Sequence, residues 1–232
     1  MWPPSGYEEI EFAAEVANWI YSQLQCVLPQ NIIGDLHKFA VAGHSRGGYA
    51  AFALALGHAK TPLKVKISAL AGVDPVAGTS IKDQLEPKIL DYVASSMNLT
   101  IPVTVIGSGL GDQSVFPMSP ACAPDGVNHK EFFYECKPPC SHFVATDYGH
   151  MDFLNDQLNL IGDLARAGCK GCWPWVSRNP LRSSAGGILV AFLETYFKGE
   201  SHDYLAILHK PSLAPAKLDP VQFKDSSNIA QV

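Results

Sequence analysis

The stretch that decides the fold is Lys38-Phe39-Ala40-Val41-Ala42-Gly43-His44-Ser45-Arg46-Gly47-Gly48, which leads into the small apolar run 49–56. Residues 38–42 are typical of a strand and 49–56 of a helix. Gly43 to Gly47 fits G-x-S-x-G, the nucleophile elbow, in which a sharp strand-to-helix turn holds a serine hydroxyl clear of the sheet. We expect glycine at 43 and 47 because a side chain at either place would collide with the neighbouring strand or helix. The pattern predicts Ser45 as a nucleophile, with a plain glycine-rich turn as the alternative.

Composition favours one globular α/β domain. The chain has 232 residues, of which 47% are hydrophobic and 17% charged. A net charge of −5 without a basic run argues against nucleic-acid binding. No apolar run reaches the roughly 18 residues of a membrane span, so no transmembrane segment is expected. Residues 1–30 are acidic and resemble neither a secretory signal nor a transit peptide.

Strand-like and helix-like segments alternate along the chain. Strands are expected at 38–42, 64–73, 102–106 and 142–146, and helices at 8–28, 49–56 and 185–197. The segment of about 107–139 is expected to be irregular, and a second segment, polar and cysteine-bearing, runs from the fourth strand to about 182. We predict a single domain over 1–210 and a flexible tail over 211–232. Alternation of this kind indicates a mostly parallel sheet flanked by helices.

Four chemically active side chains follow four successive predicted strands. Ser45, Asp74, Asp112 and His150 each lie just past a carboxyl end, and active groups of parallel sheets gather at that edge. A serine needs an adjacent base, usually a histidine oriented by a carboxylate. His150 is predicted as that base because it follows a late strand in a glycine-bearing loop.

This reasoning does not decide which aspartate is the acid. The expected chain order is serine, acid, histidine, and both Asp74 and Asp112 satisfy it. Asp147 and Asp152 are local alternatives that are more typical of loop or cap residues.

The six cysteines include two close pairs, Cys136/Cys140 and Cys169/Cys172. Their spacing allows a four-cysteine zinc site or disulfides. Loop thiols with one or two bridges are the favoured interpretation. Redox catalysis by the second pair is disfavoured because no thioredoxin-like βαβ pattern surrounds it.

Three stretches together resemble the plant chlorophyllases: Gly43-His44-Ser45-Arg46-Gly47-Gly48, Gly72-Val73-Asp74-Pro75-Val76 and Tyr148-Gly149-His150-Met151-Asp152. The resemblance implies an α/β-hydrolase that cleaves the phytyl ester of chlorophyll, with Ser45 as nucleophile, His150 as base and Asp74 preferred over Asp112 as acid. The backbone N–H of Arg46, the residue after the nucleophile, is expected to donate to the oxyanion. This chemistry requires no metal and no other cofactor.

The same resemblance implies chlorophyll as substrate and, through it, the chloroplast and peripheral association with a membrane. The cytosol or another endomembrane compartment is the alternative location. A general lipase or esterase of the same fold is the alternative activity.

The elbow comes early, because about half of an α/β-hydrolase sheet normally precedes it. We therefore expect an N-terminally incomplete domain in which 39–42 form an unpaired apolar edge. The loop that usually supplies the second oxyanion N–H would then be missing. The chain alone is expected to be poorly soluble or weakly active, or to be a remnant that acts as a binding protein.

Overall fold

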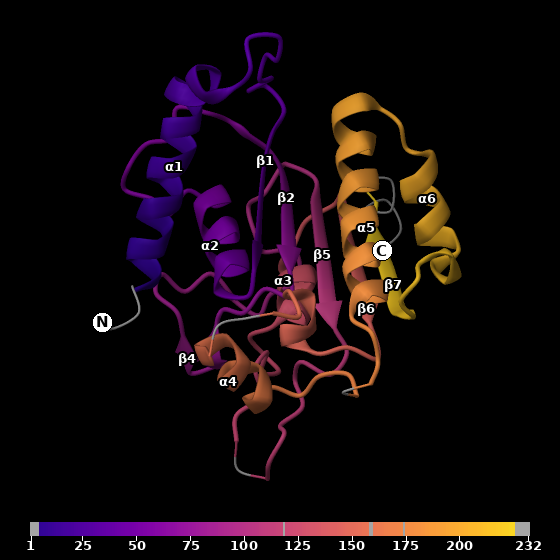
Figure 1. Ribbon diagram of the computed structural model, residues 1–232. Coiled ribbons are helices and arrows are strands. Elements are labelled where there is room, and N and C mark those ends of the chain that lie inside the picture. Colours follow the sequence, from indigo (N-terminus) through magenta and orange to yellow (C-terminus); the bar gives the residue numbers. More distant parts are fainter. Residues whose placement is uncertain (1–4, 118, 158–159, 174, 226–232) are drawn as a thin grey trace.

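A five-stranded sheet forms the centre of the computed structural model, which describes residues 5–117, 119–157, 160–173 and 175–225 (Figure 1). Its strands, in spatial order, are β1 (Phe39–His44), β2 (Ile67–Val73), β5 (Val103–Ser108), β6 (Cys140–Ala145) and β7 (Leu218–Lys224). The first four are parallel, and β7 pairs antiparallel with β6. A short hairpin, β3 (Gly78–Ser80) with β4 (Asp83–Gln84), stands apart from the sheet. The predicted mostly parallel α/β architecture is confirmed.

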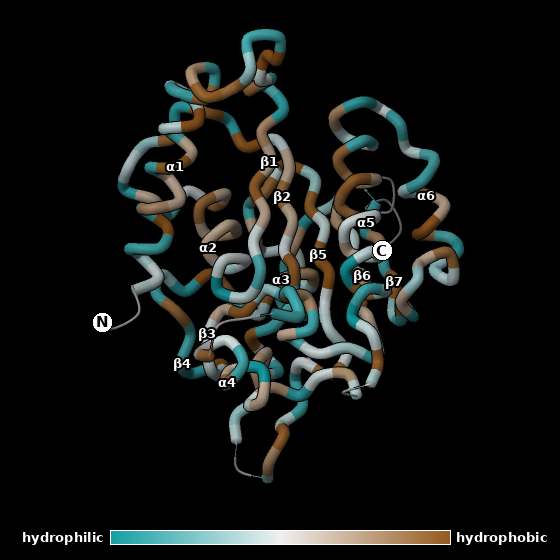
Figure 2. The backbone as a smooth tube through the Cα atoms, in the orientation of Figure 1, coloured by the Kyte–Doolittle hydropathy of each residue, from teal (hydrophilic) through white to brown (hydrophobic). Residues whose placement is uncertain are grey.

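Helices cover both faces of this sheet. They are α1 (Gly6–Val27), α2 (Arg46–Ala55), α3 (His129–Glu135), α4 (Leu160–Gly168), α5 (Asn179–Lys198) and α6 (His202–His209), with the 3₁₀ turns η1 (His150–Phe153) and η2 (Pro211–Leu213). Side chains alternate between the faces, so Leu70 and Val105 join the core beneath α1, α2 and α3. Ala69 and Ile106 join the core beneath α5 and α6. Figure 2 shows the hydrophobic strands between more hydrophilic outer segments.

Helix α1 has a capping signal at its N-terminus and an apolar stripe along one face. Ser5 caps it, accepting from the Glu8 N–H while the Glu8 side chain returns to the Ser5 N–H, which satisfies two donors that a helix start leaves unpaired. Ile10, Ala14 and Ala17 form its buried stripe. The predicted helix is confirmed, starting two residues earlier than expected.

The expected irregular segment 107–139 is only partly irregular, because it contains α3. Asn128 caps this helix by accepting from the Lys130 N–H, and Phe132 and Phe133 bury its apolar side. Seven residues were too few to show a helical period in the sequence.

The expected flexible tail is wrong for residues 211–224, which form η2 and β7. Leu218 is buried and Val221 packs against the core under α5. Pro220 is tolerated because β7 is an edge strand, where a missing N–H need not break a ladder. Residues 226–232 of the predicted tail lie outside the described residues.

Strand β1 occupies the opposite edge, as expected, and its only sheet neighbour among the described residues is β2. Within those same residues, no helix combines the length and the apolar character that crossing a bilayer requires.

Candidate active site

The elbow has the geometry that its sequence predicts. β1 ends at His44, α2 begins at Arg46, and Ser45 between them has φ 59° and ψ −127°, a conformation that side-chain-bearing residues rarely adopt. A Cβ on Gly43 would lie 2.1 Å from the Gly47 carbonyl oxygen, which explains glycine there. The steric expectation for Gly47 is wrong, because a Cβ there meets nothing within 4 Å. Gly48 is the second crowded position, where a Cβ would lie 2.8 Å from Pro75 Cβ.

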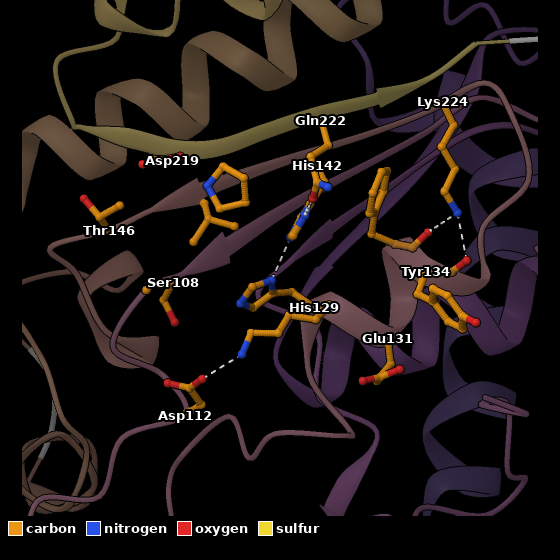
Figure 3. A pocket seen from close by; sticks show the side chains of 15 residues that line it. Ser108, Asp112, His129, Glu131, Tyr134, His142, Thr146, Asp219, Gln222 and Lys224 are labelled. Atoms are coloured by element: carbon orange, nitrogen blue, oxygen red, sulfur yellow. Dashed lines mark hydrogen bonds and ion pairs between the residues drawn. The ribbon is translucent and has the colours of Figure 1, made fainter. Parts of the chain in front are cut away.

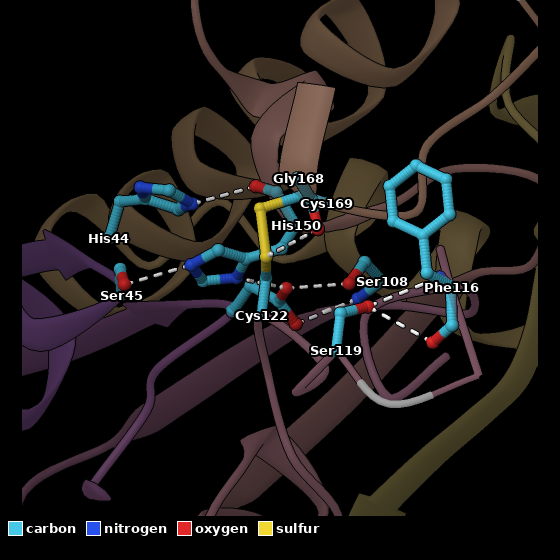
Figure 4. Close-up of a disulfide and its surroundings, with 10 residues drawn as sticks. His44, Ser45, Ser108, Phe116, Ser119, Cys122, His150, Gly168 and Cys169 are labelled. Carbon is cyan, nitrogen blue, oxygen red and sulfur yellow. Dashed lines mark hydrogen bonds and ion pairs between the residues drawn. A yellow bond between two sulfur atoms is a disulfide. The ribbon is translucent and has the colours of Figure 1, made fainter. Parts of the chain in front are cut away.

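Ser45, His150 and Asp74 form one hydrogen-bonded chain. Ser45 Oγ lies 2.8 Å from His150 Nε2 (Figure 4). His150 Nδ1 lies 2.7 Å from Asp74 Oδ2. The three residues follow β1, β6 and β2, at the carboxyl edge of the sheet. A hydroxyl, an imidazole and a carboxylate in this order can transfer the serine proton to the ring while the carboxylate orients it.

Asp74 is fully buried and well supplied with donors. Its Oδ1 accepts from the Ser108 backbone N–H at 2.9 Å, and its Oδ2 accepts from Ser108 Oγ at 2.5 Å. Burial alone would raise the pKa of Asp74, but the hydrogen bond from His150 and the positive potential of His129 and His150 outweigh it and lower that pKa. Asp112 instead pairs with Lys130 at 2.8 Å and is not hydrogen-bonded to His150.

His44 supports the imidazole of His150, a contact that the sequence reasoning missed. The two rings stack with centroids 4.7 Å apart, and His44 Nε2 donates to the His150 carbonyl oxygen at 3.0 Å. Burial and the nearby His150 lower the pKa of His44, so the ring is neutral near neutral pH. The position of His44 directly before Ser45 was the only signal in the sequence that could have indicated this contact.

Asp152 holds the turn that carries His150. This buried carboxylate accepts from the backbone N–H groups of Gly149 and Cys172 at 2.8 and 2.7 Å, and from Arg178 Nε at 2.7 Å. It does not touch Ser45, which agrees with its interpretation as a cap residue. Asp147 makes no hydrogen bond to His150.

Arg46 combines two features at the start of α2. Its guanidinium pairs with Glu9 of α1 at 2.9 Å, which ties the elbow helix to α1. Its backbone N–H belongs to the first turn of α2, directly after Ser45. Ser45 and Arg46 face a cavity of about 270 Å³ whose wall also includes Thr79, in the β3–β4 hairpin, and Cys122.

A disulfide joins Cys122, in the segment between β5 and α3, to Cys169, directly after α4, and lies beside His150 in the view of Figure 4. Cys169 is therefore not available to the four-cysteine zinc site considered from the sequence, and the redox pair with Cys172 is not formed. Cys136, Cys140 and Cys172 are buried thiols. The partner of Cys169 could not be found from spacing, because Cys122 lies 47 residues away.

A family model described as "Chlorophyllase" matches residues 1–225. The chain belongs to the chlorophyllase family. It is 48% identical to "Chlorophyllase type 0" of Chenopodium album over 93% of this chain and 61% of that protein. It is 46% identical to "Chlorophyllase-1, chloroplastic" of Citrus unshiu over 98% and 66%, and 45% identical to "Chlorophyllase-1" of Arabidopsis thaliana over 98% and 70%. This chlorophyllase-family chain thus spans about three fifths to two thirds of the length of the first two relatives.

A solved structure shares the fold. The chain resembles a ferulic acid esterase from Streptomyces cinnamoneus with a TM-score of 0.52 and 17% identity, over 84% of this chain and 51% of that one. The likeness supports the α/β-hydrolase fold of this chlorophyllase-family chain.

Proposed function

We propose that the chain is a serine carboxylesterase that hydrolyses the phytyl ester of chlorophyll to chlorophyllide and phytol. The observation that carries the proposal is the position of His150, which bridges Ser45 at 2.8 Å and Asp74 at 2.7 Å in a chain of the chlorophyllase family. Asp74 rather than Asp112 is the proposed acid, because Asp112 is engaged by Lys130.

In the proposed mechanism His150 Nε2 takes the proton of Ser45 Oγ as the oxygen attacks the ester carbonyl carbon. The oxyanion of the tetrahedral intermediate faces the Arg46 backbone N–H. The carbon–oxygen bond to phytol then breaks, and His150 gives its proton to the phytol oxygen. Water, deprotonated by His150, attacks the acyl-enzyme; chlorophyllide leaves as a carboxylic acid and Ser45 regains its proton. Asp74 holds the ring and stabilises its charged form.

Peripheral association with a membrane belongs to the same proposal, as does location in the chloroplast. Large apolar side chains are exposed on the segments that follow η1 and on the loop of Cys122. These are Phe116, Leu160, Leu164, Trp173 and Trp175. Exposed aromatic and aliphatic side chains of this kind suit the boundary of a lipid layer, where a substrate with a phytyl tail resides.

The test measures chlorophyllide release from chlorophyll and hydrolysis of a short p-nitrophenyl ester by the purified chain. Ser45→Ala and Asp74→Asn should each lower kcat by about 10³-fold or more, while the matched Asp112→Asn should leave it within about threefold, since only an exposed ion pair is lost. Faster turnover of the short ester than of chlorophyll would favour a general esterase. Failure of an organophosphonate to label Ser45 would favour a binding protein and reject the proposed activity.

A further inference from the structure

Two buried histidines lie on the side of Asp74 that does not contact His150. His129 Nε2 is 3.9 Å from Asp74 Oδ1, and both His129 and His142 are 2% exposed. His129 Nδ1 lies 2.8 Å from His142 Nε2, and His142 Nδ1 lies 3.1 Å from Gln222 Oε1 on β7. Figure 3 shows Gln222, His142 and His129 in a row along one cavity, which has a volume of about 760 Å³. The row leads from the proposed acid to an exposed residue.

The rings are held firmly in place. A Cβ on Gly107 would lie 2.3 Å from His129 Nδ1, so the ring lies directly on the backbone of β5. Phe133 stacks on His142 with centroids 4.9 Å apart and an interplanar angle of 19°. Neither ring can turn without displacing these neighbours.

Proton positions follow from the contacts. If His142 Nδ1–H donated to Gln222, His142 Nε2 would accept from His129 Nδ1–H. His129 Nε2 would then need a second proton to avoid facing Asp74 with a lone pair, and His129 would be cationic. Burial opposes this, because it lowers the pKa of His129 and lowers that of His142 to about 3.

If the hydrogen bonds donate in the opposite direction, each ring nitrogen faces a suitable partner while both histidines stay neutral. The two ends of a glutamine amide have the same shape, so the network decides which end faces the ring. With the Gln222 amide nitrogen toward His142, Gln222 donates to His142 Nδ1 and His142 Nε2–H donates to His129 Nδ1. His129 Nε2–H then points toward Asp74. At 3.9 Å this last contact is electrostatic rather than a hydrogen bond.

We propose that Gln222, His142 and His129 form a neutral, one-directional hydrogen-bond relay that positions Asp74 and links it to the cavity shown in Figure 3. The proposal rests on the proposed function, in which Asp74 is the triad acid. His129 and His142 act through Asp74 and are positioning residues. The N–H end of the neutral relay stabilises the Asp74 carboxylate and disfavours a positive charge on His150.

Other charged groups face the relay from each neighbouring element. They are Asp74 after β2, Asp112 in the loop after β5, Lys130 and Glu131 on α3, and Asp219 and Lys224 on β7. Lys130 is paired with Asp112, and Lys224 Nζ donates to three backbone carbonyl groups at the end of α3. These partners leave the histidine pair as the direct connection between the cavity and Asp74.

The first test does not depend on activity. Long-range ¹H–¹⁵N NMR spectra of the ¹⁵N-histidine-labelled full chain report the tautomer of each ring, with His129→Gln and His142→Gln used for assignment. We expect both rings to be neutral Nε2–H tautomers at pH 7. A cationic ring, or an Nδ1–H tautomer at either position, overturns the relay. If the tautomers are as expected but the chain hydrolyses no ester, the proposed function fails while the relay stands.

The second test reverses the relay from its exposed end. In Gln222→Glu the carboxylate accepts from His142 Nδ1–H, which turns the lone pair of His129 toward Asp74 and makes a charged His150 more favourable. The acidic limb of kcat/KM against pH should move up by about half a pH unit or more, about threefold in the equilibrium constant. Gln23→Glu on exposed α1 makes the same chemical change and should leave the limb in place. An unmoved or lowered limb in Gln222→Glu overturns the proposal.

Discussion

Replacing Asp152 with alanine should damage the protein far more than replacing Asp156, although both carboxylates pair with Arg178. Asp152 is 1% exposed and accepts three N–H groups at 2.7–2.8 Å. Asp156 has an exposed side chain, 3.5 Å from Arg178 and 2.8 Å from Arg182. The two variants therefore compare a buried carboxylate with an exposed one around the same guanidinium.

The magnitude follows from the contacts that are lost. Asp152→Ala leaves the backbone N–H groups of Gly149 and Cys172 without acceptors, and breaking a buried ion pair from one side costs about 3–5 kcal/mol. Asp156→Ala removes only exposed ion pairs, which solvent screens and which contribute little to stability. For a chain of this size, the first change should lower Tm by roughly 6–20 °C. A displaced His150 should also lower kcat by up to about 10²-fold.

The assay is urea unfolding followed by tryptophan fluorescence, with ester hydrolysis measured on the same samples. The reasoning is refuted if the two variants unfold at the same urea concentration. It is also refuted if Asp152→Ala is strongly destabilised while its kcat in the folded state equals that of the wild type, because Asp152 would then not hold the His150 turn.

Three further predictions concern the elbow, the disulfide and a buried histidine. Gly43→Ala should cost about 1–3 kcal/mol or more because its Cβ meets the Gly47 backbone, whereas Gly47→Ala should be neutral or stabilising by up to about 1 kcal/mol; equal melting temperatures would contradict this. Replacing Cys122 and Cys169 with serine should lower the free energy of unfolding by about 2–4 kcal/mol, and a thiol reductant should lower the wild-type Tm similarly; insensitivity to reductant would contradict it. Burial lowers the pKa of His142 from 6.5 to about 3, so between these pH values the unfolded state binds a proton that the folded state does not, and stability falls with falling pH by about 1.4 kcal/mol per pH unit. In His142→Gln the urea midpoint should therefore depend less on pH between pH 4 and 6 than in the wild type. An equal pH dependence in the two proteins would refute this.

The sheet could be predicted from the sequence because its strands carry local signals. Apolar runs that end in glycine or aspartate identified β1, β2, β5 and β6, and the serine motif identified the turn. Chain order also placed His150 near Ser45, since parallel strands bring their carboxyl ends together.

What could not be predicted depends on contacts between distant segments. The sequence of β7 contains Asp219-Pro220 and is typical of a loop. It forms a strand because it pairs antiparallel with β6. The roles of His129 and His142 were missed because these residues lie in or before the last parallel strand. Only the packed structure shows that the two rings contact each other and that His129 lies beside Asp74.

The edge position of β1 has a consequence for how the protein opens. Strand β5 has ladders on both sides, with β2 and β6, whereas β1 has a ladder with β2 alone in the described part of the chain. Hydrogen exchange should therefore proceed faster at the β1 amides than at those of β5, through partial openings that leave the centre of the sheet folded. Because Ser45 directly follows β1, such an opening would carry this proposed nucleophile away from His150 first, so inactivation should precede global unfolding as denaturant is raised.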